Sequence, residues 1–253
     1  MPAPIALQLY TLREALAQDF EGVIRQVASI GYAGVEPAGF HGNTPQAAKQ
    51  LFDELGLAVP AAHLDLPIGE RRDEILDTAQ TLGARYIVNG GLGPKRFATV
   101  DLIKEVCEQF NEASAAATSR GMRFAVHNHW WEFEPVEGQY PYQLMMELLD
   151  PNVVWEVDTY WVKTAGPDPV TVLGELGARA PLLHIKDGPA VQSEPMVAAG
   201  QGTLDIPAIV RAGEAHTEWL IVELDRCATD MLEAVAQSYR YLAEEGLGRG
   251  TQG

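Results

Sequence analysis

The sequence predicts a closed (β/α)8 TIM barrel, a single domain over residues 1–253, from three observations. Short β-type runs alternate with helical runs from one end of the chain to the other, and eight β-type runs can be recognised. This alternation is typical of parallel strands joined by crossover helices. Eight such units of roughly 30 residues each fill the chain. Polar residues gather late in the β-type runs, where this fold places its active site.

The candidate strands are rich in β-branched and other apolar residues. They cover residues 5–11, 34–38, 58–64, 85–89, 123–129, 153–159, 181–187 and 219–225.

Helix signals lie between these runs. Thr44 and Pro45 read as an N-cap and a first turn. Glycines that would stop helices stand at positions 31, 56, 83 and 121. A last helix is expected from about 229 to 245, with one apolar stripe that packs on the sheet. The stripe contains Met231, Leu232, Val235, Tyr239 and Leu242.

A doubly wound open sheet is the alternative fold. The first candidate strand is not followed by the G-x-G-x-x-G signature of dinucleotide-binding sheets, which favours the barrel. The glycine-rich stretches GGLG at 90–93 and GQG at 200–202 are expected to be turns into the next helix.

Charge and composition limit the partners. A formal net charge of −17 disfavours nucleic acid and anionic membranes, and would slow the approach of a phosphorylated substrate unless a local Lys or Arg binds it. Residues 1–14 lack the pattern of a signal peptide, and no run approaches the roughly 18 apolar residues of a membrane helix. Two cysteines suit a reducing compartment, so a cytoplasmic location is expected. A homo-oligomer is an open alternative to a monomer.

Strand parity places the polar residues on one face. In the sixth run Glu156 and Asp158 share one face, and three apolar residues share the other. In the seventh run His184 and Lys186 likewise lie on the face opposite the apolar residues. Glu223 and Asp225 share a face in the eighth run, as do His127 and His129 in the fifth. Charged groups against the surrounding helices would lack partners. The polar face is therefore expected to line the barrel interior near its open end.

Several other residues have two possible roles. Glu36 and His63, late in the second and third runs, are either site residues or satisfied core groups. Glu156, one layer below Asp158, is expected to be a buried ion-pair or supporting group rather than a ligand. The aromatic residues are packing residues or surfaces on which a sugar stacks. These are Trp130, Trp131 and Trp161.

A family resemblance follows from these residues. The stretches HNHWWEF, WEVDTYWVKTAG, LLHIKDG and IVELD, with QLYTLREALAQDFEGVIRQVASIGYAGVE at the start, resemble the sugar phosphate isomerase/epimerase family of xylose-isomerase-like TIM barrels. That superfamily includes ketose 3-epimerases, hydroxypyruvate isomerases, inosose dehydratases and, more distantly, a DNA-repair endonuclease. The resemblance covers most of the chain and is most specific at the last four strands.

The resemblance implies a site with one divalent metal ion. Its ligands would be Glu132, Asp158, His184 and Glu223. On the fifth strand His127, His129, Glu132 and Glu134 compete for the ligand position; Glu132 is favoured, and His127 and His129 become substrate or proton-transfer groups. Carboxylates and one imidazole suit Mn²⁺ or Mg²⁺, with Co²⁺ or Zn²⁺ as alternatives.

The implied reaction begins with proton removal beside a carbonyl and passes through an enediolate. Glu132, Glu223 and His127 are the expected catalytic residues, and the substrate is a small sugar or polyol. The expected substrate-binding residues are Glu36, His63, His129, Trp161 and Lys186. An isomerase or epimerase is predicted; the alternative is a dehydratase or lyase acting on a keto-inositol or 3-keto-glycoside. An endonuclease is disfavoured by the charge, and a non-catalytic sugar-binding barrel is a further alternative.

Overall fold

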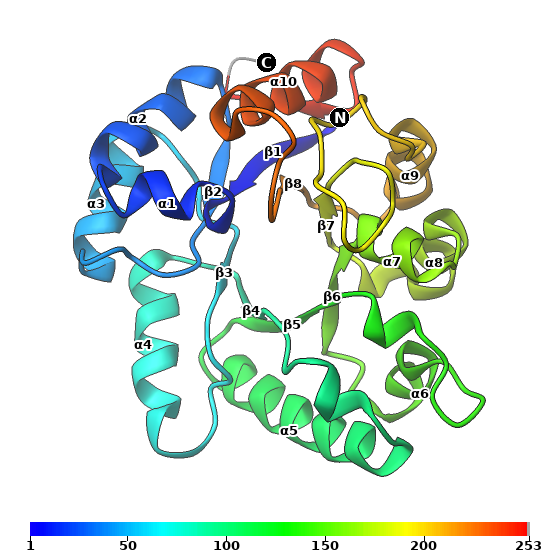
Figure 1. The fold of residues 1–253 in the computed structure, drawn as a ribbon. Coiled ribbons are helices and arrows are strands. Elements are labelled where there is room, and N and C mark those ends of the chain that lie inside the picture. The colour runs from blue at the N-terminus through cyan, green and yellow to red at the C-terminus, as the bar shows by residue number, and fades with distance from the viewer. Residues whose placement is uncertain (252–253) are drawn as a thin grey trace.

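A ring of strands enclosed by helices makes up the structure, a computed structural model that describes residues 1–251 (Figure 1). The eight strands of the ring are parallel and pair in the order β2-β1-β8-β7-β6-β5-β4-β3. Their bounds are β1 Ala3–Gln8, β2 Gly34–Glu36, β3 Ala61–His63, β4 Tyr86–Asn89, β5 Arg123–His127, β6 Val154–Asp158, β7 Leu182–Ile185 and β8 Trp219–Val222. A short ninth strand, β9 Gly248–Arg249, pairs with β1. The predicted single-domain (β/α)8 barrel is confirmed; the outer limits of 1–253 stay a prediction, because residues 252 and 253 lie outside the described part.

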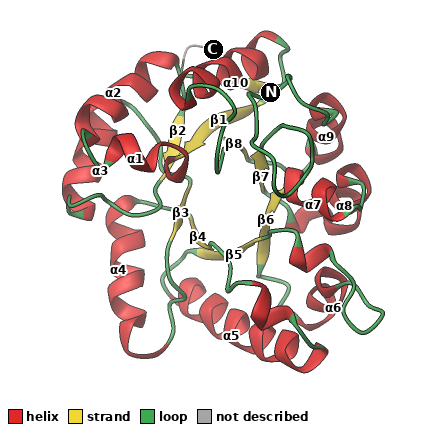
Figure 2. Cartoon of the chain, in the orientation of Figure 1, coloured by secondary structure: helices red, strands yellow, loops and turns green. Residues whose placement is uncertain are grey.

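Helices surround the strands (Figure 2). The α-helices are α1 Arg13–Leu16, α2 Phe20–Ile30, α3 Pro45–Glu54, α4 Arg72–Leu82, α5 Val100–Ser119, α6 Pro141–Leu148, α7 Thr159–Ala165, α8 Pro169–Leu176, α9 Ile206–Gly213 and α10 Met231–Glu244. Thr44 caps α3 by accepting a hydrogen bond from Ala47 N, as predicted. Gly31 and Gly83 end α2 and α4 with left-handed backbone angles, which glycine adopts without steric cost.

Closure of the ring is weakest between β2 and β3. There an isolated bridge joins Gly34 to Ala58, and His63 N donates to the carbonyl of Pro37 at 2.8 Å. The third strand begins at residue 61 rather than at the predicted 58. Pro60 explains the difference, because it has no N–H to donate to a neighbouring strand.

Five of the predicted strands extend two or three residues too far into the segments after them. The first, second, fifth, seventh and eighth end at residues 8, 36, 127, 185 and 222. After β1, the side chain of Gln8 accepts a hydrogen bond from Tyr10 N and turns the chain into the short 3-10 helix Leu9–Leu12. After β5, the chain turns into the 3-10 helix Trp131–Phe133. Many of the predicted site residues therefore lie just beyond strand ends.

The inside of the barrel has an apolar layer and, nearer the carboxyl ends of the strands, a polar layer. We call the apolar layer the lower one and the polar layer the upper one. The lower layer is a cluster separate from the larger core beneath the helices; it contains Ala6, Ala61, Tyr86, Val88, Ala125, Val154, Leu182 and Ile221. Two positions farther along the strands, buried polar residues follow on the same faces, among them Gln8, His127, Glu156 and His184. The parity argument thus located the interior correctly.

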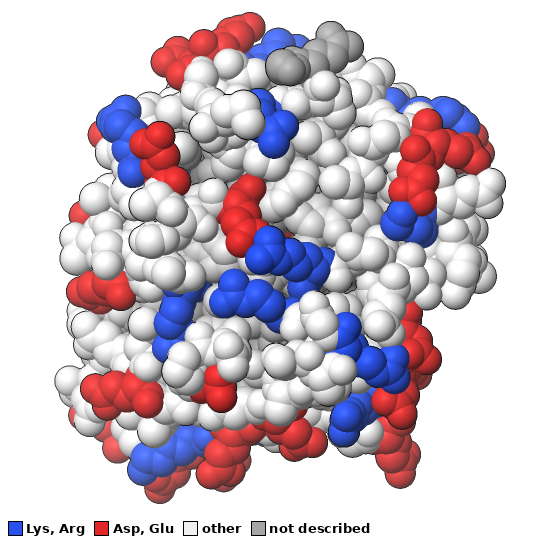
Figure 3. Space-filling model, turned by 180° about the vertical axis from the view of Figure 1, so that it is seen from behind, with Lys and Arg blue, Asp and Glu red and all other residues white. Residues whose placement is uncertain are grey.

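The face of the molecule that lies behind the view of Figure 1 carries charged side chains of both signs (Figure 3). At the start of β4, Arg85 and Arg123 flank the ring of Tyr86, with guanidinium carbons 5.4 and 5.8 Å from its centroid. Arg85 also pairs with Glu218 at 2.7 Å. None of the helices within residues 1–251 combines the length and apolar composition that crossing a bilayer requires.

Candidate active site

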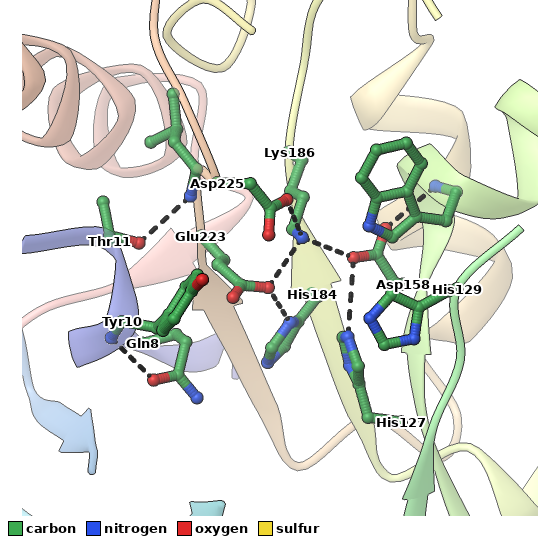
Figure 4. A network of polar contacts seen from close by, with 12 residues as sticks. Gln8, Tyr10, Thr11, His127, His129, Asp158, His184, Lys186, Glu223 and Asp225 are labelled. Carbon is green, nitrogen blue, oxygen red and sulfur yellow. Dashed lines mark hydrogen bonds and ion pairs between the residues drawn. The ribbon is translucent and has the colours of Figure 1, made fainter. Parts of the chain in front are cut away.

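Four side chains from successive strands converge at the upper end of the barrel (Figure 4). They are His127 of β5, Asp158 of β6, His184 of β7 and Glu223, which follows β8. One possible ligand atom from each lies within 4.8 Å of the others, and all four residues are buried. Three of them, Asp158, His184 and Glu223, are residues that the resemblance assigned to a metal.

Lys186 lies among the carboxylates of this group. Its Nζ is 2.9 Å from Asp158 Oδ2, 2.7 Å from Glu223 Oε2 and 2.7 Å from Asp225 Oδ2. Burial disfavours the ammonium charge, but the three carboxylates outweigh burial and hold the pKa of Lys186 well above its usual range. Lys186 therefore neutralises part of the negative charge of these three carboxylates, and its ammonium group is not exposed to solvent.

His184 connects the converging group to a second polar cluster deeper in the barrel, the lower cluster. Its Nδ1 lies 2.7 Å from Glu223 Oε2, and its Nε2 lies 2.9 Å from Glu36 Oε2. Burial opposes a charge on this imidazole, but Glu156 and Glu223 outweigh burial and raise its pKa well above the usual range. A doubly protonated His184 donates to carboxylates on both sides.

Glu156 is the centre of the lower cluster. Its Oε2 lies 2.7 Å from His63 Nε2, 3.0 Å from His184 Nε2 and 3.2 Å from His127 Nδ1. Burial would raise its pKa, but His184 and His63 outweigh burial and hold it well below the usual range. One carboxylate thus orients three imidazoles, which agrees with the supporting role expected for Glu156.

Glu36 belongs to this lower cluster. It is fully buried, and its Oε2 accepts from Gln8 Nε2 at 2.7 Å. Burial, followed by the charge of Glu156, raises its pKa to about 7. Glu36 therefore lies behind His184, where it can orient that imidazole.

Glu132 is buried beside the turn after β5. Within residues 1–251 it is in neither of the two groups of closely spaced ligand atoms, and His127 occupies the fifth-strand place in both. Its Oε2 accepts a hydrogen bond from His129 N at 2.9 Å and so stabilises the turn after β5. Burial raises the pKa of Glu132 to about 8. Glu134, another of the four fifth-strand candidates, is exposed.

Asn128 is a structural residue of the site that the sequence patterns did not single out. Its side chain donates to the carbonyl of Asp158 at 3.1 Å and accepts from Asp158 N at 2.9 Å. These two bonds imitate the pairing of a strand and hold Asp158 beside β5. The one available signal was its place between two histidines in HNH, because parity alone would have turned it towards the helices.

Aromatic rings form a wall beside the site. His129 stacks on Trp131 with ring centroids 4.1 Å apart, and Trp130 packs between Trp131 and Trp161. Lys186 Nζ lies 5.4 Å from the ring of Trp161. Burial lowers the pKa of His129 to about 2, so this imidazole is neutral at physiological pH.

A cavity of about 270 Å³ opens above the converging group. It is lined by Tyr10, Ala38, His63, Gly90, His127, His129, Glu223 and Asp225. Of the predicted substrate-binding residues, His63 and His129 belong to this lining. Glu36, Trp161 and Lys186 are not part of it within residues 1–251, and Tyr10 and Asp225 are lining residues that the sequence patterns did not assign.

The GQG stretch surrounds a carboxylate of the protein itself. Asp187 accepts hydrogen bonds from the backbone N–H groups of Gly188, Gly200, Gly202 and Leu204 at 2.8–3.2 Å. A Cβ at Gly202 would lie only 2.1 Å from Asp187 Oδ1, so glycine is required there. The stretch is a turn, as expected, and it fixes the loop that follows Lys186.

Comparison with known proteins identifies relatives of the same fold. The solved structure of a sugar phosphate isomerase/epimerase from Parabacteroides distasonis ATCC 8503 is 26% identical, with a TM-score of 0.81 over 96% of this chain and 94% of the other. An L-ribulose 3-epimerase is 15% identical, with a TM-score of 0.72 over 97% and 94% of the two chains.

A probable 3-DHS dehydratase from Bacillus anthracis is 14% identical, with a TM-score of 0.75 over 96% and 99%. The last two identities are low enough that these structures show the fold and not the reaction. No curated protein matches the chain by sequence.

A family model described as xylose isomerase-like TIM barrel matches residues 24–245, which is most of the chain. The protein belongs to the xylose isomerase-like TIM barrel family.

Proposed function

We propose that the protein is a divalent-metal-dependent sugar isomerase or epimerase that removes a proton beside a carbonyl group and proceeds through an enediolate. The observation that carries this proposal is the convergence of His127, Asp158, His184 and Glu223 below a cavity at the upper end of the barrel. The isomerase and epimerase names of similar structures support it.

The donor atoms fit such an ion. Carboxylate oxygens and imidazole nitrogens are ligands of Mn²⁺, Mg²⁺, Co²⁺ and Zn²⁺. Asp158 Oδ2 is buried and makes no hydrogen bond within residues 1–251, and its close contact is the ion pair with Lys186. The second ring nitrogens of His127 and His184 lie against Glu156, which would hold both rings in a ligating orientation.

We propose His127, Asp158, His184 and Glu223 as the ligands. His127 replaces Glu132 because the structure brings its imidazole into the group of four. When bound, the ion would supply positive charge that stabilises the oxygen of the carbonyl as negative charge develops on it.

Side chains of the protein would then remove and return the proton on the carbon beside the carbonyl group. Glu223 lines the cavity, and although burial raises its pKa, Lys186 and His184 outweigh burial and hold it well below the usual range. Glu223 is therefore ionised and can accept the proton from the carbon beside the carbonyl. The neutral imidazole of His129 can accept a hydrogen bond from a substrate hydroxyl, and the raised pKa of Glu132 suits an acid rather than a base.

Solvent exchange tests this function. Protein loaded with Mn²⁺ in D₂O is expected to introduce deuterium beside the carbonyl of any ketose that it turns over. Glu223→Gln keeps the shape of the side chain but removes its basicity, so exchange should fall by at least about 100-fold. Glu134→Gln, at an exposed position, is the matched control. Turnover without solvent deuterium in the wild-type product would contradict the proposed mechanism.

Elimination is the second candidate function, because a dehydratase is among the similar structures. It would begin with the same proton removal and then expel a leaving group on the next carbon. Mass analysis of the product separates the two, since isomerisation conserves mass and dehydration loses one water.

A further inference from the structure

A second cavity, of about 490 Å³, adjoins the first on the same side of the barrel. It lies between the segment after β1 and the segment after β8, and its volume is in the range of about 300–1000 Å³ that small-molecule sites occupy. It is lined by Thr11, Leu12, Arg13, Glu14, Ala15, Gln18, Asp225, Arg226, Cys227, Asp230, Met231 and Leu232.

The two cavities share a thin wall. Asp225 lines both, and its backbone oxygen accepts a hydrogen bond from Arg13 Nη2 at 2.9 Å. The guanidinium of Arg13 lies 4.2 Å from the ring centroid of Tyr10, which lines the first cavity. Tyr10 is 43% exposed, and Arg13 and Asp225 are half-buried. A ligand with two joined rings could therefore place one ring on each side of Asp225.

The lining favours a neutral polyhydroxylated group. Two guanidinium groups, of Arg13 and Arg226, face three carboxylates, so hydrogen-bond donors and acceptors are both present and the summed charge is negative. Hydroxyl groups use donors and acceptors equally, whereas a phosphate would be repelled by the excess of carboxylates. Leu12, Met231 and Leu232 add apolar surface that suits the C–H face of a sugar ring.

We propose that the second cavity is a distal subsite that binds a neutral sugar ring joined to the group reacting in the first cavity. The substrate is then a glycoside or disaccharide rather than a free monosaccharide. This inference rests on the proposed function, because it needs a sugar carbonyl beside Glu223.

Cavity-filling variants test the subsite. Ala15→Trp and Gln18→Trp both place a large neutral side chain at an exposed position of the lining, so neither should disturb the core. Ala115→Trp, at an exposed position of α5, is the matched control. Binding to the Mn²⁺-loaded protein is measured by calorimetry with D-fructose, with its glucoside turanose and with fructose 6-phosphate.

Wild-type protein and the Ala115→Trp control should bind turanose at least tenfold more tightly than D-fructose, about 1.4 kcal/mol. Ala15→Trp and Gln18→Trp should lose this preference while their Kd for D-fructose stays within about twofold of wild type. Equal binding of the two sugars by wild type, or an unchanged preference in both variants, would overturn the subsite alone. Preference for the phosphate ester would overturn its neutral character. Absence of binding by all three sugars would reject the sugar function together with the subsite.

Discussion

Asp158, the last residue of β6, and Asp187, just after the neighbouring β7, are both buried, but their oxygens have different partners. Asp187 accepts four backbone N–H groups from its own loop. Asp158 accepts one, from Trp161 N, and its other oxygen lies against the ammonium of Lys186. A carboxylate satisfied by backbone amides stabilises a loop and cannot exchange its partners without unfolding that loop. A carboxylate paired with a side-chain ammonium can exchange that partner for another cation, which is what a metal ligand requires.

The largest expected effect is on the loop. Asp187→Asn replaces an acceptor oxygen by an amide NH2 group, a donor that faces backbone N–H groups, so we expect the free energy of unfolding to fall by about 3–5 kcal/mol. Urea denaturation with and without Mn²⁺ measures this. Asp205→Asn, at the N-cap of α9, is the control and should cost less than about 1 kcal/mol, because Asn caps a helix about as well as Asp. A loss at Asp187 no larger than in this control would contradict the structural role.

The second prediction concerns metal affinity. Asp158→Asn keeps the oxygen that caps α7 but removes the charge, so Mn²⁺ should bind at least about 100-fold more weakly, or about 2.8 kcal/mol. Equilibrium dialysis gives the Kd. Asp168→Asn, which removes the same charge from the N-cap of α8, should bind as wild type does. Equal affinities for the two variants would mean that Asp158 is not a ligand.

Glu132 offers an intermediate case, with one backbone hydrogen bond and a pKa of about 8. The folded protein holds this carboxyl group in its neutral form, because its folded-state pKa lies above the unfolded value. The stability that results is fully present below about pH 4.5 and is lost as the pH rises towards 8. In metal-free protein, Glu132→Gln should gain roughly 2 kcal/mol relative to wild type between about pH 5.5 and pH 7. Unfolding curves at several pH values check this. A parallel pH profile for wild type and Glu132→Gln, like the one expected for Glu134→Gln, would remove the claim.

The smallest expected effect tests the exchange of cations directly. Lys186 competes with a divalent ion for Asp158 and Glu223, so Lys186→Met should bind Mn²⁺ about tenfold more tightly, or by about 1.4 kcal/mol. The metal-free variant should also melt at a lower temperature, because it leaves these carboxylates without a cation. Lys163→Met, on the surface of α7, carries the same charge change. Weaker Mn²⁺ binding by Lys186→Met would show that the ammonium assists the metal site instead.

The sequence alone determined the barrel and the interior position of the polar layer. Alternation of strand and helix requires parallel strands, and the pleat sends every second side chain to the same face, so Glu156, Asp158 and His184 could be placed inside without coordinates. This argument holds only within a strand, where the hydrogen-bonded ladder fixes the direction of each side chain.

Beyond the strand ends only the tertiary structure decided the outcome. Glu132 follows a turn whose direction depends on contacts that no local pattern encodes, and the structure directs its carboxylate to the backbone of His129 and brings His127 to the converging group. Lys186 and Asp187 are adjacent in sequence, yet one joins carboxylates from two other strands and the other holds a loop that extends to residue 204. Their partners lie many residues away along the chain, and long-range hydrogen bonds and ion pairs, rather than local periodicity, select them.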